Sequence, residues 1–187
     1  MDKSKSTFKT VDLVYIALGA VLIAICSCIS IPTLVPLTMQ TFAVFCVLSV
    51  LGGKRGTMAV IVYLIIGAAG VPVFAEFTSG IAIVLGTTGG YMVGFIFIGL
   101  IYGLAVRLFG KKLWVEIVSL SVGMAGCYAF GTAWLMFVYA RASEAVGLMT
   151  ALGWCVFPFI IPDLIKLGLA LLVSRRVSPM IEKQNRN

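Results

Sequence analysis

Apolar runs long enough to cross a membrane recur along almost the whole chain. A helix of about 20 apolar residues spans the hydrocarbon core of a bilayer. Of the 187 residues, 61% are hydrophobic and 11% charged, too few polar side chains for the surface of a water-soluble domain. We therefore expect an all-α integral membrane protein, a single domain over residues 1–187. Its six transmembrane helices are expected at about residues 11–30, 37–52, 56–69, 89–109, 112–140 and 147–174.

Basic residues collect in alternate connections between these runs. Lys and Arg are retained on the cytoplasmic side of a membrane, so their distribution predicts orientation. The connections on the other side contain only Arg141, and Lys166 lies inside the last run. This distribution predicts cytoplasmic N- and C-termini. The remaining twelve of the 14 basic residues are Lys3, Lys5, Lys9, Lys54, Arg55, Arg107, Lys111, Lys112, Arg175, Arg176, Lys183 and Arg186.

The stretch from Gly70 to Gly90, between the third and fourth expected helices, is apolar but broken by glycine, proline and hydroxyl residues. The predicted orientation makes it a long outward-facing loop with one short helix. Irregular backbone is tolerated at membrane depth only where it is buried in protein or lines a cavity. The stretch therefore predicts a binding cavity that opens to the outside.

An acid and a base, Asp163 and Lys166, interrupt the last apolar run. Three residues apart on a helix, they share one face. Each costs about 2.5–3.5 kcal/mol at the centre of a membrane helix, so such residues are functional candidates. Pro162 is expected to begin a helical segment just before them. We predict that the two side chains hold one polar ligand; the alternative is a structural ion pair between helices.

Three further side chains are candidates for contact with the ligand. Gln40 follows two prolines at the start of the second run, where it can face a ligand or cap a helix end. In Gly86–Tyr91 the glycines permit a tight turn, and Thr88 offers a hydroxyl. Tyr91 presents a ring with a polar tip. It can stack on a ligand or pack between helices.

Small residues form a stripe along the first run, with Ala20 and Ala24 four residues apart. Small side chains let membrane helices approach closely. The stripe predicts either packing within the chain or docking to another membrane protein.

Several classes of function find no support. The net charge of +7 sits between apolar runs rather than among stacking aromatics, which argues against nucleic acid. The five cysteines lie in apolar runs, without histidine or a C-x-x-C pair, so neither a metal nor a cofactor is expected. Glu116 is expected to pair locally with Lys112. Asp163 is then the only intramembrane carboxylate, and no phosphate-binding motif for ATP is present.

Two rival functions remain open from the residues alone. An intramembrane enzyme acting on a lipid or isoprenoid would use Asp163 as its acid. A proton-coupled small-molecule carrier would use the same residue as its relay. The lack of a second expected buried carboxylate counts against both.

Four motifs in chain order resemble one known family. They are Pro32-x-x-x-Pro36-x-Thr-x-Gln40-Thr41, Gly70-Val-Pro-Val-Phe-Ala75, Gly86-x-Thr-Gly-Gly-Tyr91 and Pro158-Phe-x-x-x-Asp163-Leu-x-Lys166. The chain resembles the biotin-specific substrate-binding (S) component of energy-coupling factor (ECF) vitamin transporters. The resemblance implies a six-helix protein of the bacterial plasma membrane, not an enzyme, that captures biotin from outside with high affinity. Its partners would be a transmembrane coupling subunit, met through Ala20 and Ala24, and two cytoplasmic ATPases.

The chemistry of biotin matches the candidate residues. Its ureido ring has two N–H donors and a carbonyl, which suit Asp163 as acceptor and Lys166 as donor. Its thioether ring and aliphatic tail suit an apolar wall that includes Tyr91. The tail carboxylate is expected near the loops, where Ser79, Thr78 and backbone N–H groups are available.

Overall fold

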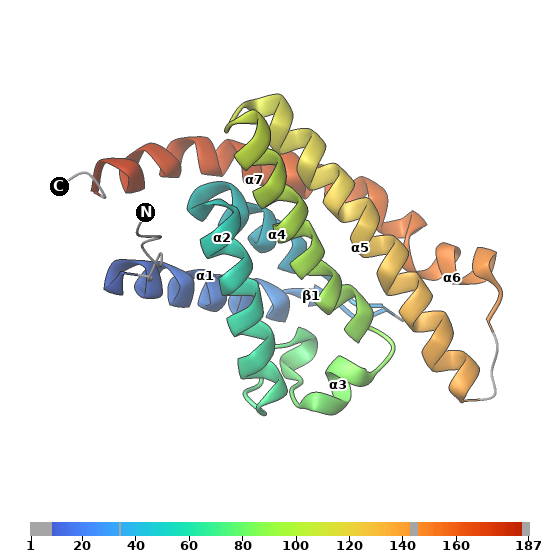
Figure 1. Cartoon of the computed structure of the whole chain (residues 1–187). Helices are drawn as coiled ribbons and strands as arrows, with labels where there is room; N and C mark the ends of the chain where they lie inside the picture. Colours follow the sequence, from blue (N-terminus) through green and yellow to red (C-terminus); the bar gives the residue numbers. More distant parts are fainter. Residues whose placement is uncertain (1–8, 34, 143–145, 185–187) are drawn as a thin grey trace, which may run out of the picture.

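The computed structural model describes residues 9–33, 35–142 and 146–184; Lys3, Lys5 and Arg186, used to predict the orientation, lie outside these residues. The described chain is almost entirely helical (Figure 1). Five helical segments in it are long and apolar enough to cross a membrane, which confirms the predicted class. The long helices are α1 (Thr10–Cys28), α2 (Gln40–Ala68), α4 (Gly89–Phe109), α5 (Leu113–Arg141) and α7 (Phe157–Gln184).

Helix α2 consists of two arms, which correspond to the second and third predicted helices. Gly52, with φ 81° and ψ 167°, interrupts the helical backbone between them. Glycine adopts this conformation without the penalty that a side chain would bring. The two arms fold back on each other so closely that a Cβ added to Gly56 would lie 2.9 Å from the Cα of Leu48. The structure has five candidate spans rather than the six predicted helices, because α2 contains two of the predicted helices, separated by this break.

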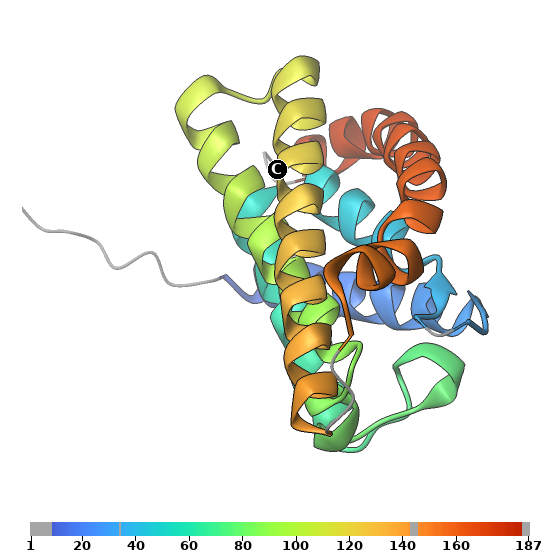
Figure 2. The same cartoon turned by 90° about the vertical axis from the view of Figure 1, so that its right-hand side faces the viewer.

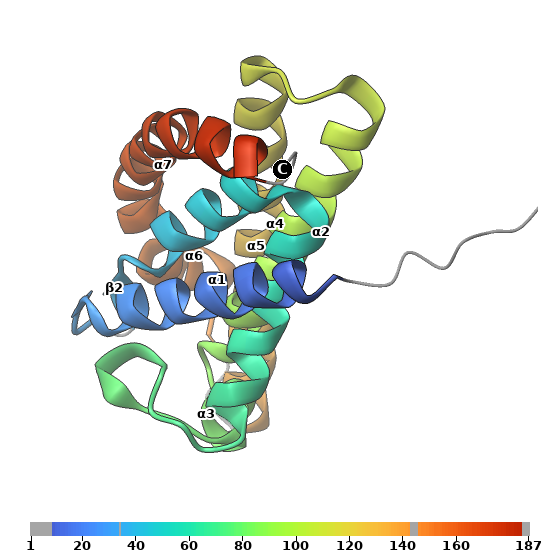
Figure 3. The same ribbon diagram turned by 90° about the vertical axis from the view of Figure 1, so that its left-hand side faces the viewer.

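Helices α4 and α5 lie side by side in both views (Figures 1 and 2). Their close approach depends on small residues: a Cβ added to Gly123 of α5 would lie 2.9 Å from the Cα of Ile98 on α4. Helix α1 packs against α2 (Figure 3). At this contact, a Cβ added to Gly19 would lie 3.0 Å from the Cβ of Ala59. Small residues thus set the helix spacing, as they commonly do in membranes.

The two connections that flank α2 contain regular secondary structure. Between α1 and α2, strands β1 (Ser30–Ile31) and β2 (Leu37–Thr38) form an antiparallel pair. Between α2 and α4 lie a 3₁₀ turn, η1 (Ala75–Phe77), and a five-residue helix, α3 (Ile81–Leu85). The connection between α2 and α4 thus contains one short α-helix, and its outward orientation stays a prediction. The hydroxyl of Ser27 at the end of α1 donates a hydrogen bond to the carbonyl of Val73 in this connection.

The predicted helix at 147–174 is wrong in its boundaries. It is two helices, α6 (Leu148–Cys155) and α7, separated by Val156 at φ −123° and ψ −57°. Pro162 does not begin a segment but lies inside α7, which starts five residues earlier. Helix α7 also continues past Arg175 and Arg176 to Gln184.

The expectation that no second carboxylate is buried is also wrong. Glu116 on α5 is only 5% exposed, and its Oε1 accepts a hydrogen bond of 2.7 Å from the buried hydroxyl of Tyr102 on α4. Because α4 packs against this face of α5, the acid faces a neighbouring helix, while Lys112 is exposed. Helices α1 and α2 are also joined by an ion pair of 2.5 Å between Asp12 and Arg55.

Candidate ligand-binding site

A cavity of about 300 Å³ lies among the β-strand connection, the start of α2, the α2–α4 connection and helices α4 to α7. Its size is at the lower end of the range for small-molecule sites. The cavity is lined by both apolar and polar side chains. The apolar lining includes Phe74, Met92, Phe95, Met124 and Phe159, and the polar lining includes Thr38, Gln40, Thr41, Tyr128, Asp163 and Lys166.

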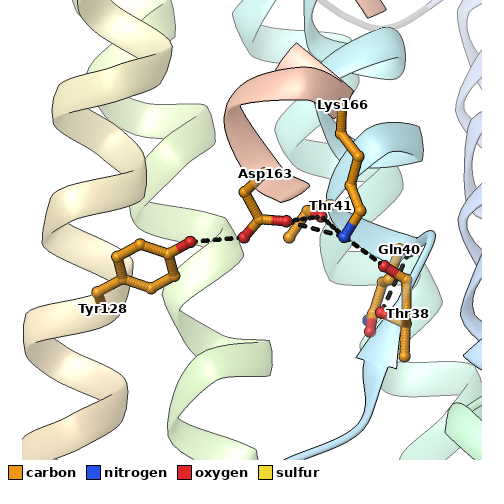
Figure 4. Close-up of polar contacts among 6 residues, drawn as sticks. All are labelled: Thr38, Gln40, Thr41, Tyr128, Asp163 and Lys166. Atoms are coloured by element: carbon orange, nitrogen blue, oxygen red, sulfur yellow. Dashed lines mark hydrogen bonds and ion pairs between the residues drawn. The ribbon is translucent and has the colours of Figure 1, made fainter. Parts of the chain in front are cut away.

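Helix α7 places Asp163 and Lys166 together on the cavity, as their spacing predicts. They are 1% and 7% exposed, and the Nζ of Lys166 lies 2.8 Å from Oδ1 of Asp163 (Figure 4). An ion pair this deep is stable only when its remaining hydrogen-bonding groups are satisfied. The three-residue spacing on α7 brings the two charges together, and groups on three neighbouring elements provide their other hydrogen bonds.

The carboxylate of Asp163 has two further donors. Oδ1 accepts a hydrogen bond of 2.8 Å from the hydroxyl of Thr41, and Oδ2 accepts one of 2.6 Å from the hydroxyl of Tyr128 (Figure 4). Thr41 lies in the first turn of α2 and Tyr128 in the middle of α5. The acid therefore ties three helices together at one end of the cavity.

The ammonium of Lys166 is equally engaged. It donates to the backbone carbonyl of Thr38 at 2.7 Å and to the hydroxyl of Thr41 at 3.2 Å, besides its bond to Asp163. A lysine has three N–H donors, and all three have partners here. The ammonium is thus fully satisfied within the chain, so a ligand that binds it must exchange a hydrogen bond. The carboxylate of Asp163 accepts two hydrogen bonds at Oδ1 and one at Oδ2, so Oδ2 can accept one more.

The structure brings Gln40, Tyr91 and Thr88 to the same cavity. Gln40 is buried, and its Nε2 donates a 3.0 Å hydrogen bond to the hydroxyl of Tyr63 on the second arm of α2. Tyr91 lines the cavity and shares a 2.9 Å hydrogen bond with the hydroxyl of Thr132 on α5. Both side chains therefore serve helix packing while they face the cavity.

Other predicted residues lie elsewhere. Ser79 is not among the cavity-lining residues, although the neighbouring Thr78 is. Ala20 is 3% exposed and belongs to the apolar core, and Ala24 is half-buried against it. Packing within the chain is thus present at both alanines. It buries Ala20, so docking to a partner stays a prediction for Ala24 alone.

Sequence reasoning missed Tyr128 and Thr38 and gave no role to Thr41. A signal for Tyr128 existed, because Tyr128 and Thr132 are four residues apart in an apolar run and share one helix face. The role of Thr38 carries no such signal, because it depends on a backbone carbonyl that the β-strand pair presents.

The described residues contain no group of three His, Cys, Asp or Glu side chains able to hold a metal ion. Cys127 and Cys155 line the cavity as free thiols.

Comparison with known proteins adds independent findings. A family model described as the BioY family matches residues 1–183. The biotin transporter BioY of Thermotoga maritima is 37% identical over 173 residues, which are 90% of this chain and 96% of that protein. The biotin transporter BioY2 of Lactococcus lactis is 35% identical over 167 residues, 89% of this chain and 87% of that protein. The similarity extends over nearly the whole sequence.

A solved structure shares the fold. The crystal structure of the S-component for biotin from an ECF-type ABC transporter matches this chain with a TM-score of 0.78 and 26% sequence identity. The match covers 95% of this chain and 94% of that one. The chain thus shares its overall fold with that S-component.

Proposed function

This chain belongs to the BioY family, and from that premise we propose that it is the biotin-binding subunit of an ECF importer. It is a multi-pass membrane protein whose cavity receives biotin. The ureido head group lies at the buried end, against Asp163 and Lys166. The protein binds and delivers its ligand and carries out no chemistry on it.

The observation that carries this proposal is the hydrogen-bonded set around Asp163. A ureido ring offers two N–H donors beside one carbonyl acceptor. Asp163 presents a carboxylate and Lys166 an ammonium 2.8 Å away, on the same side of the cavity. Hydrogen bonds with a charged partner are the stronger kind, so this arrangement both selects and retains such a ring.

Biotin binds by exchange of partners. One ureido N–H donates to Oδ2 of Asp163 beside the hydroxyl of Tyr128, and the ureido carbonyl accepts from Lys166 in place of the hydroxyl oxygen of Thr41. The thioether ring then meets Phe95, Met92 and the ring of Tyr91. Because each lost hydrogen bond is replaced, burial of the apolar rings supplies the net gain.

Energy for transport comes from partners. The sequence contains no G-x-x-x-x-G-K-[ST] motif, so ATP hydrolysis belongs to two cytoplasmic ATPases joined through a transmembrane coupling subunit. The basic turn at Lys54 and Arg55 and the α4–α5 turn face the cytoplasm. The α2–α4 connection and the cavity face outward. The coupling subunit meets the small-residue stripe at Ala24, since Ala20 is buried within the chain.

Ligand analogues test the head-group assignment without altering the protein. Purified chain in detergent is titrated with labelled biotin and then with unlabelled competitors. Desthiobiotin, which keeps the ureido ring, is expected to compete within about tenfold of biotin, whereas diaminobiotin, which lacks the ureido carbonyl, loses at least about 100-fold. If diaminobiotin competes as well as biotin, the proposal is wrong.

A further inference from the structure

The cavity carries one charge that the ureido head group leaves unused, the carboxylate of Glu76. Among the described residues that line the cavity, the charged side chains are Asp163, Lys166 and Glu76. Asp163 and Lys166 are buried and paired, whereas Glu76 is exposed. A residue that both lines the cavity and reaches solvent lies where the cavity opens. The charges of the pair offset each other, so Glu76 sets the sign of the charge at this mouth.

The backbone holds Glu76 in place. Glu76 and Phe77 both have positive φ, 56° and 58°, a conformation rare for residues with a side chain. Such residues persist where the surrounding structure fixes them, and they concentrate around ligands. Here the N–H of Phe74 donates to the carbonyl of Thr78 at 3.1 Å, and the N–H of Thr78 donates to the carbonyl of Ala75 at 3.2 Å. The side chain of Phe74 is itself buried, so the loop is anchored in the core.

The hydroxyls near the mouth present acceptors rather than donors. Thr78 donates its hydroxyl proton to the carbonyl of Ala75 at 2.8 Å, and Thr33 donates its own to the carbonyl of Val35 at 2.5 Å. Both threonines line the cavity. A hydroxyl engaged in this way offers only its lone pairs to a ligand. Together with Glu76, these hydroxyls can accept a hydrogen bond from an N–H group of a ligand. They offer no donor to a ligand carboxylate.

We propose that Glu76 makes the site favour biotin whose tail ends in an amide or an amine over biotin with a free carboxylate. This inference rests on the proposed function, since it needs the ureido ring at Asp163 and the tail at the mouth. An aliphatic carboxylic acid is ionised at neutral pH. The tail of free biotin therefore brings a like charge toward Glu76, while an amide is neutral and an ammonium is attracted. The favoured substrate class is amide-linked biotin, such as biotin joined to the side-chain amine of lysine.

Three ligands and two variants test the role of Glu76. Biotin, biotinamide and biotin N-(2-aminoethyl)amide are titrated against wild-type protein, Glu76→Gln and Asp12→Asn. In the wild type the amine-tailed ligand binds tightest and biotin weakest, with a spread of about tenfold. In Glu76→Gln biotin binds about threefold to tenfold more tightly, the amine-tailed ligand binds more weakly, and biotinamide changes less than twofold. Asp12→Asn removes a carboxylate that does not line the cavity and keeps the wild-type order.

The outcomes separate two failures. If none of the three ligands binds the wild-type protein, the proposed function itself is wrong. If they bind but Glu76→Gln keeps the wild-type spread, or shifts all three ligands equally, the role of Glu76 is wrong. Salt provides a second readout, because it screens an exposed charge, with a Debye length of about 3 Å at about 1 M salt. At this salt concentration the difference in affinity among the three ligands should narrow in the wild type and stay unchanged in Glu76→Gln. A wild-type spread that stays constant in high salt counts against the inference.

Discussion

Two carboxylates are buried among the helices of this protein, and their surroundings differ. Asp163 is 1% exposed, pairs with Lys166 and lines the cavity. Glu116 is 5% exposed, accepts a hydrogen bond from Tyr102 and does not line the cavity. Burial and hydrogen bonding are therefore common to both acids. What distinguishes Asp163 is its ion pair with Lys166 and the cavity beside it.

This difference limits what an intramembrane charge indicates. Such a residue is a functional candidate by default. Glu116 shows that the same burial also arises where an acid joins two helices, α4 and α5. We therefore assign the ligand to the acid that lines the cavity and a structural role to the other. Substitutions at the two sites are expected to separate binding from stability.

The largest effect on binding is expected from Asp163→Asn. The change keeps the side-chain shape but removes the charge that accepts the ureido N–H groups, and hydrogen bonds to charged groups contribute about 1.5–3 kcal/mol each. Biotin affinity should fall at least about 100-fold, measured by titration of labelled biotin into purified protein. Gel filtration and thermal melting report whether the variant is folded. A folded variant that binds within threefold of wild type would remove Asp163 from the site.

Lys166→Met should have the second-largest effect and lower biotin affinity about tenfold to 100-fold in the same titration. Methionine keeps the apolar stem and removes the donor to the ureido carbonyl. Because Asp163 then keeps Thr41 and Tyr128 as donors, the buried carboxylate is not left alone. Lys112→Ala, an exposed lysine outside the cavity, is the matched control and should bind like wild type. Equal behaviour of the two lysine variants would contradict the assignment.

Tyr128→Phe should have a smaller effect, about threefold to tenfold on biotin affinity. The variant keeps the ring and removes one hydrogen bond that orients Asp163. Phe130→Leu provides a control on the same helix, at a residue that does not line the cavity. If Tyr128→Phe binds biotin more tightly than wild type, the hydroxyl competes with the ligand instead of orienting its partner.

Glu116→Gln should have the smallest effect on binding, less than threefold. Its expected effect is on stability, because the charged hydrogen bond from Tyr102 becomes a neutral one and about 1 kcal/mol is lost. Thermal melting in detergent should show the decrease, and Tyr102→Phe should show a similar one. A loss of binding comparable to that of Asp163→Asn would abolish the distinction between the two acids.

Much of the fold could be predicted because membrane helices leave a strong signal. The length and apolar character of the runs identify every long helix, and glycine and proline mark the irregular stretch that lines the cavity. The breaks were harder to predict. The run 147–174 contains two prolines, Pro158 and Pro162. Pro158 lies in the first turn of α7, where proline is favoured, and marks the division into α6 and α7, whereas the prediction placed the start of a segment at Pro162. The membrane orientation stays a prediction from the basic residues.

The candidate site could be predicted where its residues are close in sequence. Asp163 and Lys166 share a helix face by spacing alone, and the structure places both on the cavity. Their partners come from more than 30 residues away, as Tyr128 does, or from a backbone carbonyl, as at Thr38. The αL conformation of Glu76 likewise has no marker, since glutamate is not a residue that favours positive φ.

A crystal or cryo-EM structure of the protein with bound biotin tests the central claim most directly. We predict density for the ureido ring at the buried end of the cavity, with its nitrogens and its carbonyl oxygen about 3 Å from the Asp163 carboxylate and the Lys166 ammonium. A ureido ring bound elsewhere, with the bonds among Asp163, Lys166, Thr41 and Tyr128 unchanged, would contradict it.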